Sequence, residues 1–126
     1  MNIQRRFANF IVFALLAGSG CSRAVKPEGI YTFHSAGIIE RLELRSDGAF
    51  TQIISEAGRG YTNDGRWSIE NLRVLKLRPF LVRFDTRSER EITPMKYSLY
   101  TGRLEQRGTR IAFDDFSKYF LLREGH

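Results

Sequence analysis

The 126-residue chain lacks most of the side chains on which enzymes depend. It contains one cysteine, Cys21, and two histidines, His34 and His126. A single cysteine excludes an intramolecular disulfide and a cysteine metal cluster, and two histidines are too few for the usual metal sites and catalytic triads. The remaining option is a carboxylate pair, and the adjacent Asp114 and Asp115 lie in a predicted turn where aspartate serves local hydrogen bonding. We therefore predict no catalytic residue, no metal and no cofactor.

The sequence also lacks an apolar run of the roughly 20 residues that a transmembrane helix requires. Its apolar run, residues 10–17, follows a short leader that carries Arg5 and Arg6, and small residues follow at 18–20. A positive leader, a short apolar segment and small residues together indicate a cleaved secretory signal.

The end of this segment resembles the lipobox of bacterial lipoproteins. Residues 16–21 read Leu-Ala-Gly-Ser-Gly-Cys, with one departure: Gly18 stands where the family usually has an aliphatic residue. The resemblance implies a signal peptide over 1–20, lipidation of Cys21 and, because Ser22 follows, the periplasmic side of the outer membrane in a Gram-negative cell. The alternative is an ordinary secretory signal with a leftover cysteine. A free thiol is unusual in an oxidising compartment, which favours lipidation.

The mature chain is then expected to begin with a lipidated N-terminus and short tether over residues 21–28, followed by one domain over 29–126. Seven extended residues after Cys21 reach about 24 Å, so the domain must work beside its membrane. Without Arg5 and Arg6, the chain has 18 basic and 14 acidic residues, a net charge of +4. That surplus is ordinary for solubility, and we expect no nucleic-acid partner.

Short segments with β-branched and aromatic residues, separated by turn residues, predict an all-β domain of about eight strands. The predicted strands are 29–34, 38–45, 49–55, 61–70, 73–78, 95–106, 110–113 and 118–123. Residues 80–93 are rich in charge and are predicted to form a long exposed loop. Sequential antiparallel strands of this kind form a meander, and closing it into a barrel removes the exposed edges.

A strand, the turn Ser46-Asp47-Gly48, a second strand and then Gly65-x-Trp67-x-Ile69 resemble small lipocalin-like domains of exported bacterial lipoproteins. The resemblance implies the architecture and no particular ligand. We expect Trp67 in the core, with Gly65 making room for a large neighbour or bending the strand. Glu40 falls on the inward face by parity, so we expect it near the strand's open end or beside a bulge.

These features predict an envelope lipoprotein that acts as a non-catalytic binding or assembly module. The alternatives are a carrier of a small apolar ligand, as lipocalins are, and, from another class, an envelope hydrolase. Small lipoproteins that inhibit lysozyme also use compact barrels, but they typically carry cysteines and an acidic or neutral inhibitory face.

One basic segment suggests a contact surface. Residues 73–90 hold six basic residues and two acids, and four of the basic side chains are candidates for an anionic patch: Lys76, Arg78, Arg83 and Arg87. The partner would be phospholipid headgroups beside the anchor or an acidic envelope protein. The alternative is a solvated charged face without a partner.

Overall fold

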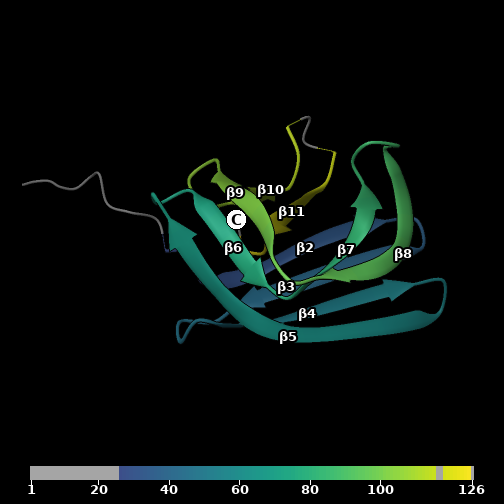
Figure 1. The fold of residues 1–126 in the computed structure, drawn as a ribbon, viewed down its shortest axis with the longest axis horizontal. Coiled ribbons are helices and arrows are strands. Elements are labelled where there is room, and N and C mark those ends of the chain that lie inside the picture. The colour runs from purple at the N-terminus through teal and green to yellow at the C-terminus, as the bar shows by residue number, and fades with distance from the viewer. Residues whose placement is uncertain (1–25, 116–117, 126) are drawn as a thin grey trace, which may run out of the picture.

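The computed structural model describes residues 26–115 and 118–125, and in these residues the chain forms ten β-strands (Figure 1). The strands are β2 (Gly29–Ser35), β3 (Ile38–Leu44), β4 (Ala49–Glu56), β5 (Arg59–Glu70), β6 (Val74–Arg78), β7 (Phe80–Asp85), β8 (Arg90–Tyr97), β9 (Tyr100–Glu105), β10 (Arg110–Ala112) and β11 (Phe120–Arg123). Their alternating burial, for example buried residues in turn with exposed or half-buried ones along β3, follows the two-residue period of the sequence.

Eight of these strands close into an antiparallel barrel in the order β10, β11, β2, β3, β4, β5, β6, β9. The neighbours β2, β3, β4, β5 and β6 follow each other along the chain, as a meander requires, and β6 pairs with β9 to continue the wall. The all-β prediction and the barrel of eight strands are confirmed, and the barrel is consistent with a lipocalin-like fold. Closure leaves these strands paired on both sides over part of their length.

The prediction for residues 80–93 is wrong. This segment forms β7 and the start of β8, a separate antiparallel hairpin between β6 and β9. The first five residues of β7, Phe80 to Phe84, are all buried. Most of the charged residues lie in the turn after Asp85. Their exposure therefore applies to the tip of the hairpin and not to the strand that precedes it.

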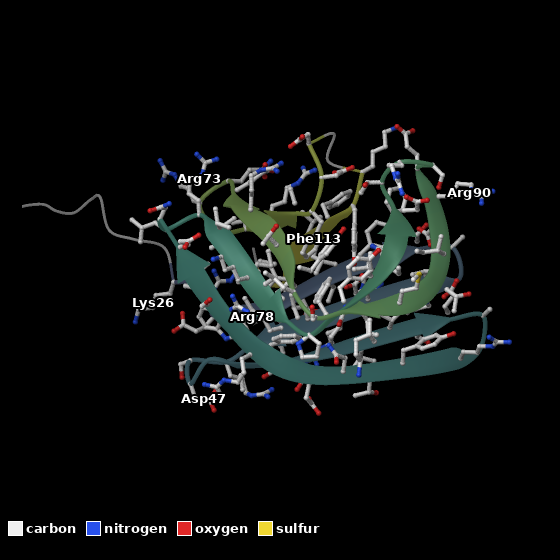
Figure 2. All side chains as sticks on the ribbon, in the orientation of Figure 1. Lys26, Asp47, Arg73, Arg78, Arg90 and Phe113 are labelled. Carbon is white, nitrogen blue, oxygen red and sulfur yellow. The ribbon has the colours of Figure 1, made fainter. Side chains whose placement is uncertain are left out.

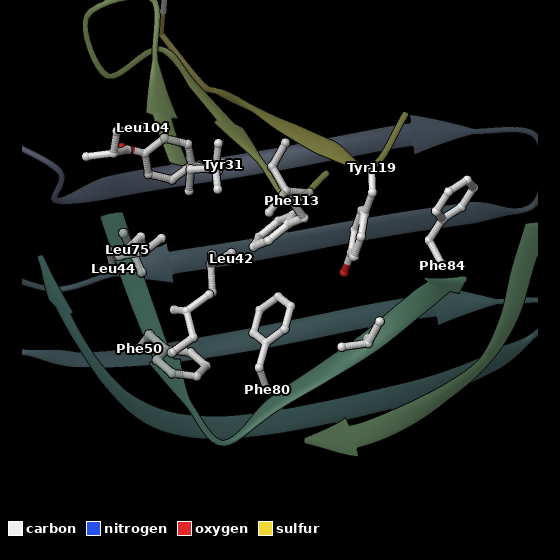
Figure 3. Close-up of a cluster of buried hydrophobic side chains, with 14 residues drawn as sticks. Tyr31, Leu42, Leu44, Phe50, Leu75, Phe80, Phe84, Leu104, Phe113 and Tyr119 are labelled. Carbon is white, nitrogen blue, oxygen red and sulfur yellow. The ribbon is translucent and has the colours of Figure 1, made fainter. Parts of the chain in front are cut away.

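The barrel core combines a group of leucines beside Tyr31 at one end with further aromatic rings toward the other (Figure 3). Leu44, Leu75 and Leu104 lie together at the first end. The rings include Phe113 and Tyr119, whose centroids are 4.6 Å apart. Tilted and edge-on ring pairs of this kind add stabilisation beyond the apolar area that they bury.

Gly65 makes room for a large neighbour, as expected, and that neighbour is the ring of Phe50. Gly65 lies opposite Phe50 in the β4–β5 register. A Cβ atom at this position would meet the carbonyl of Arg78 and stand 2.7 Å from the Phe50 ring. Trp67 packs against the core, stays partly exposed, and donates its indole N–H to the carbonyl of Arg45 at 2.8 Å.

The predicted signal peptide, residues 1–20, and the predicted lipidation site, Cys21, lie outside the described residues. Among those that are described, no helix has the length and hydropathy needed to cross a membrane. Part of the predicted tether is in contact with the barrel: the guanidinium of Arg123 donates to the carbonyls of Lys26 and Glu28. The hydroxyl of Tyr31 donates to the carbonyl of Pro27 at 2.7 Å.

Candidate functional site

A row of polar side chains crosses the inside of the barrel. Glu40 on β3, Gln52 on β4 and Asn63 on β5 are all buried, on three neighbouring strands. The pairing of β2, β3 and β4 runs without a shift past Glu40. The expected bulge is therefore absent from these strands, and Glu40 lies inside because its parity places it there.

The amide of Gln52 holds β7 as a neighbouring strand would. Its Nε2 donates to the carbonyl of Leu81 at 2.7 Å, and its Oε1 accepts from the backbone N–H of Leu81 at 2.9 Å. Asn63 adds a bond from Nδ2 to the carbonyl of Pro79 at 2.9 Å. Side chains thus satisfy backbone groups of β7 and of Pro79 just before it that no barrel strand pairs, which buried backbone requires.

A salt bridge between Glu40 and Arg83 completes this buried polar network, defined here as Glu40, Gln52, Asn63 and Arg83. Arg83 is only 1% exposed, and its Nε donates to Oε1 of Glu40 at 2.6 Å. Nη1 reaches Glu91 on β8 at 3.4 Å. The guanidinium lies over the rings of Phe33 and Tyr119, 4.1 and 4.7 Å from their centroids, while Nη2 makes no hydrogen bond.

Burial dominates the electrostatics of this network. Loss of solvent raises the pKa of the Glu40 carboxyl, although the charge of Arg83 and hydrogen bonds from Gln52, Arg83 and Tyr119 act in the opposite direction. Burial, followed by the negative charge of Glu40, raises the pKa of the Tyr119 hydroxyl well above its usual value. Tyr119 therefore stays a neutral hydrogen-bond donor to Glu40, at 3.4 Å from Oε1.

An open cleft lies between the turn of the β7–β8 hairpin and a wall formed by β9, the start of β6 and the segment after β10. We call it the hairpin cleft; its volume is about 680 Å³. The hairpin contributes Thr86, Arg87 and Glu89, and the opposite wall contributes Arg103, Asp114 and Asp115. A salt bridge of 3.3 Å from Lys118 to Glu89 joins the two walls.

Asp114 and Asp115 serve local structure, as the sequence indicates for a turn. Oδ1 of Asp114 accepts from the backbone N–H of Lys118 at 2.9 Å. Asp115 pairs with Arg103 at 3.3 Å and is almost fully exposed. The two acids thus hold the local chain conformation and the Arg103 side chain, and they also place negative charge on the cleft wall.

A second, apolar pocket adjoins the cleft and shares Thr86 and Arg87 with it. Its volume is about 340 Å³, and its lining includes Val82, Phe84 and Tyr100 from the interior. Met95 and Tyr97 on β8 also line it, although they are 55% and 42% exposed. Exposed apolar side chains beside a polar rim are typical of interaction sites.

The four residues of the predicted anionic patch do not form one surface. Lys76 and Arg78 lie on the outward face of β6, where Lys76 pairs with Glu70 at 3.3 Å. Arg87 is in the hairpin turn and lines the cleft. Arg83 is buried in the salt bridge to Glu40, so its assignment to an exposed patch is wrong. An anionic contact at Lys76, Arg78 and Arg87 stays a prediction.

The chain has no match among known protein-family models, curated proteins or solved structures. Residues 26–115 and 118–125 also contain no group of three or more His, Cys, Asp or Glu side chains placed to hold a metal ion. Part of the polar network has a signal in the sequence: Glu40, Gln52 and Asn63 are polar residues at inward-facing positions of three successive strands. Arg83 has no such signal, because β7 does not alternate between apolar and polar residues.

Proposed function

We propose that this protein is a non-catalytic binding module, lipidated on Cys21 and held at the cell-envelope membrane, and that the hairpin cleft with its apolar pocket binds a segment of an envelope protein. The observation that carries the proposal is the pair of exposed apolar side chains, Met95 and Tyr97, in a pocket that adjoins the open cleft and is backed by the buried strand β7. Aromatic and methionine side chains are enriched at protein interfaces.

The construction of the site supports this proposal. Residues that bind a partner are most precise when they stand on elements locked by packing and hydrogen bonds. β7 is locked on one face by Gln52 and Glu40 and on the other by the aromatic core. β8 extends from it with its apolar side chains partly free. The cleft itself combines charges of both signs, which suits a polypeptide segment better than an ion.

A second function, transport of a small apolar ligand, is favoured by one observation. The apolar pocket has a volume of about 340 Å³, which is near the lower end of the range for small-molecule sites. Its opening at Met95 and Tyr97 exposes much of any ligand to solvent, which is a poor arrangement for a carrier.

Site-specific photocrosslinking tests the proposal. A photoreactive phenylalanine analogue at Tyr97, in the intact lipoprotein in its own membranes, should capture one discrete protein. The matched control is the same analogue at Ile53 on the barrel wall, which is 39% exposed and should capture none. Capture of lipid alone at Tyr97 would support the carrier, and equal capture at both positions would contradict a specific site.

Lipidation is tested separately. A fatty-acid analogue should label the wild-type protein, and Cys21→Ala should abolish the label and leave the protein uncleaved or unanchored. Labelling that persists in Cys21→Ala would contradict an anchor on this residue.

A further inference from the structure

Leu72, in the turn between β5 and β6, has a backbone conformation that is unfavourable for leucine. Asn71 and Leu72 have φ angles of 55° and 62°, and the N–H of Arg73 donates to the carbonyl of Glu70 at 3.2 Å. Glycine or asparagine adopts this left-handed conformation at little cost, whereas a branched side chain such as leucine pays a steric penalty. Leu72 is also 72% exposed, so it gains little from burial.

An apolar groove lies beside this turn. Its volume is about 490 Å³, and its lining includes Trp67, Ile69, Leu72 and Leu104 together with Pro27. Trp67 is partly exposed there, with its indole N–H bonded to the carbonyl of Arg45. An aromatic ring with one apolar and one hydrogen-bonded side is characteristic of residues at a membrane–water interface.

The groove is also where the described chain begins. Lys26 and Glu28 line it, and Arg123 holds both of their carbonyls against the barrel. The segment that can separate the barrel from Cys21 is therefore residues 22–25 and not the whole stretch to Glu28. Five Cα steps from Cys21 to Lys26 span at most about 18 Å.

We infer that this end of the barrel docks on the lipid bilayer, with Leu72 and Trp67 entering the headgroup region. The inference rests on the proposed function, since the lipid on Cys21 brings the groove to the membrane. Lys26 and Arg73 flank the apolar side chains and complement anionic headgroups, while Glu28 and Glu70 lie beside them and limit that attraction. The bilayer explains an exposed leucine in a conformation that disfavours it.

Docking at this end fixes the orientation of the whole domain. Figure 2 shows Lys26 and Arg73 toward one end of the molecule and Arg90, at the start of β8, at the other. The hairpin turn, which forms one wall of the cleft, then lies toward the end away from the membrane, whereas Val74 on the opposite wall adjoins Arg73. A partner can reach the hairpin turn without passing between the domain and its own bilayer.

Trp67 gives a direct probe, because it is the only tryptophan of the chain. The processed lipoprotein is incorporated into vesicles of phosphatidylethanolamine and phosphatidylglycerol, with and without lipids brominated near the carbonyl end of the acyl chain. We expect brominated lipid to quench Trp67 fluorescence and Leu72→Asn to reduce that quenching roughly twofold or more. Leu99→Asn, which replaces an exposed leucine between β8 and β9 that does not line the groove, should leave it unchanged.

The outcomes separate this inference from the proposed function. Protein that floats with the vesicles while Trp67 is not quenched overturns the docking and leaves the anchor in place. Quenching that is equal in the wild type and Leu72→Asn overturns the role of Leu72. Protein that does not float with the vesicles overturns both. Asparagine suits the left-handed turn, so Leu72→Asn should keep the circular dichroism spectrum and melting temperature of the wild type or raise the latter.

Discussion

The two ends of the barrel interior are closed in different ways. Near Lys26 the interior is lined by Tyr31 and by aliphatic side chains such as Leu44, Leu75 and Leu104, and the strands of the wall are paired by backbone hydrogen bonds. Toward the hairpin, the long strands β3, β4 and β5 extend past β6, which pairs only with residues 66–70 of β5. There β7 covers the sheet, and the contact is made by side chains of the buried polar network.

This difference shows how a strand can be positioned without a ladder. The hydrophobic effect is non-directional, so apolar contacts alone would not specify the position of an apolar strand along the sheet that it covers. The amide of Gln52 forms hydrogen bonds with both backbone groups of Leu81, and Glu40 forms a salt bridge with Arg83, two residues further along β7. We infer that the network specifies the place of the hairpin, and with it the shape of the cleft, more than it adds to stability. Buried ion pairs often contribute little net free energy of folding.

The largest effect should come from breaking the ion pair on its acidic side. Glu40→Leu leaves the buried guanidinium of Arg83 with only the partly exposed Glu91, 3.4 Å away, as a counter-ion. Arginine cannot lose its proton, so the free energy of unfolding should fall by about 3–5 kcal/mol. Glu43→Leu, on the outward face of β3, should cost less than about 1 kcal/mol. Urea unfolding measures both.

The double variant Glu40→Leu/Arg83→Met then sharpens the comparison. With both charges gone, most of the lost stability should return, because an apolar pair can replace a buried ion pair at little cost. A double variant as unstable as Glu40→Leu alone would show that the ion pair itself supplies net stability.

Breaking the pair on its basic side should give an effect that depends on pH. Burial already raises the pKa of Glu40 in the folded state, and removing Arg83 raises it further. The folded state then keeps its proton to a higher pH than the unfolded state, so stability falls as pH rises from the usual carboxyl pKa through the folded one.

The difference in unfolding free energy between the wild type and Arg83→Met should therefore widen from acidic to neutral pH, by at most about 1.4 kcal/mol per pH unit for one proton. Unfolding curves at several pH values measure it. A difference that does not change with pH would contradict an ionisable Glu40 opposite Arg83.

A smaller effect is expected from the ladder itself. Gly65→Ala places a methyl group against the Phe50 ring and the carbonyl of Arg78. Overpacking of this kind should lower the free energy of unfolding by about 1–3 kcal/mol, independently of pH. Gly60→Ala on the same strand, where a Cβ atom meets nothing within 4 Å, is the control and should cost less. Equal losses in both variants would contradict the tight contact.

The sequence predicts the strands of the barrel wall better than it predicts the hairpin strand β7 and the buried polar network inside the barrel. Alternation identifies β3 and β6 because each has one wet and one dry face, and the turn residues separate them. β7 lacks alternation because both of its faces are buried, so its charged turn dominates the pattern. Parity places Glu40 inside, but one sequence position does not reveal that Arg83, 43 residues later, is its partner. Long-range pairing of this kind has no local signal.

Hydrogen exchange of a Gln52 variant tests most directly whether side chains hold the hairpin. Gln52→Met keeps the size of the side chain but removes both bonds to the Leu81 backbone. We expect faster amide exchange in β7 and β8 with unchanged exchange in β2 and β3, because the hairpin opens as a local unit. Equal acceleration in all strands, or none in the hairpin, would contradict it.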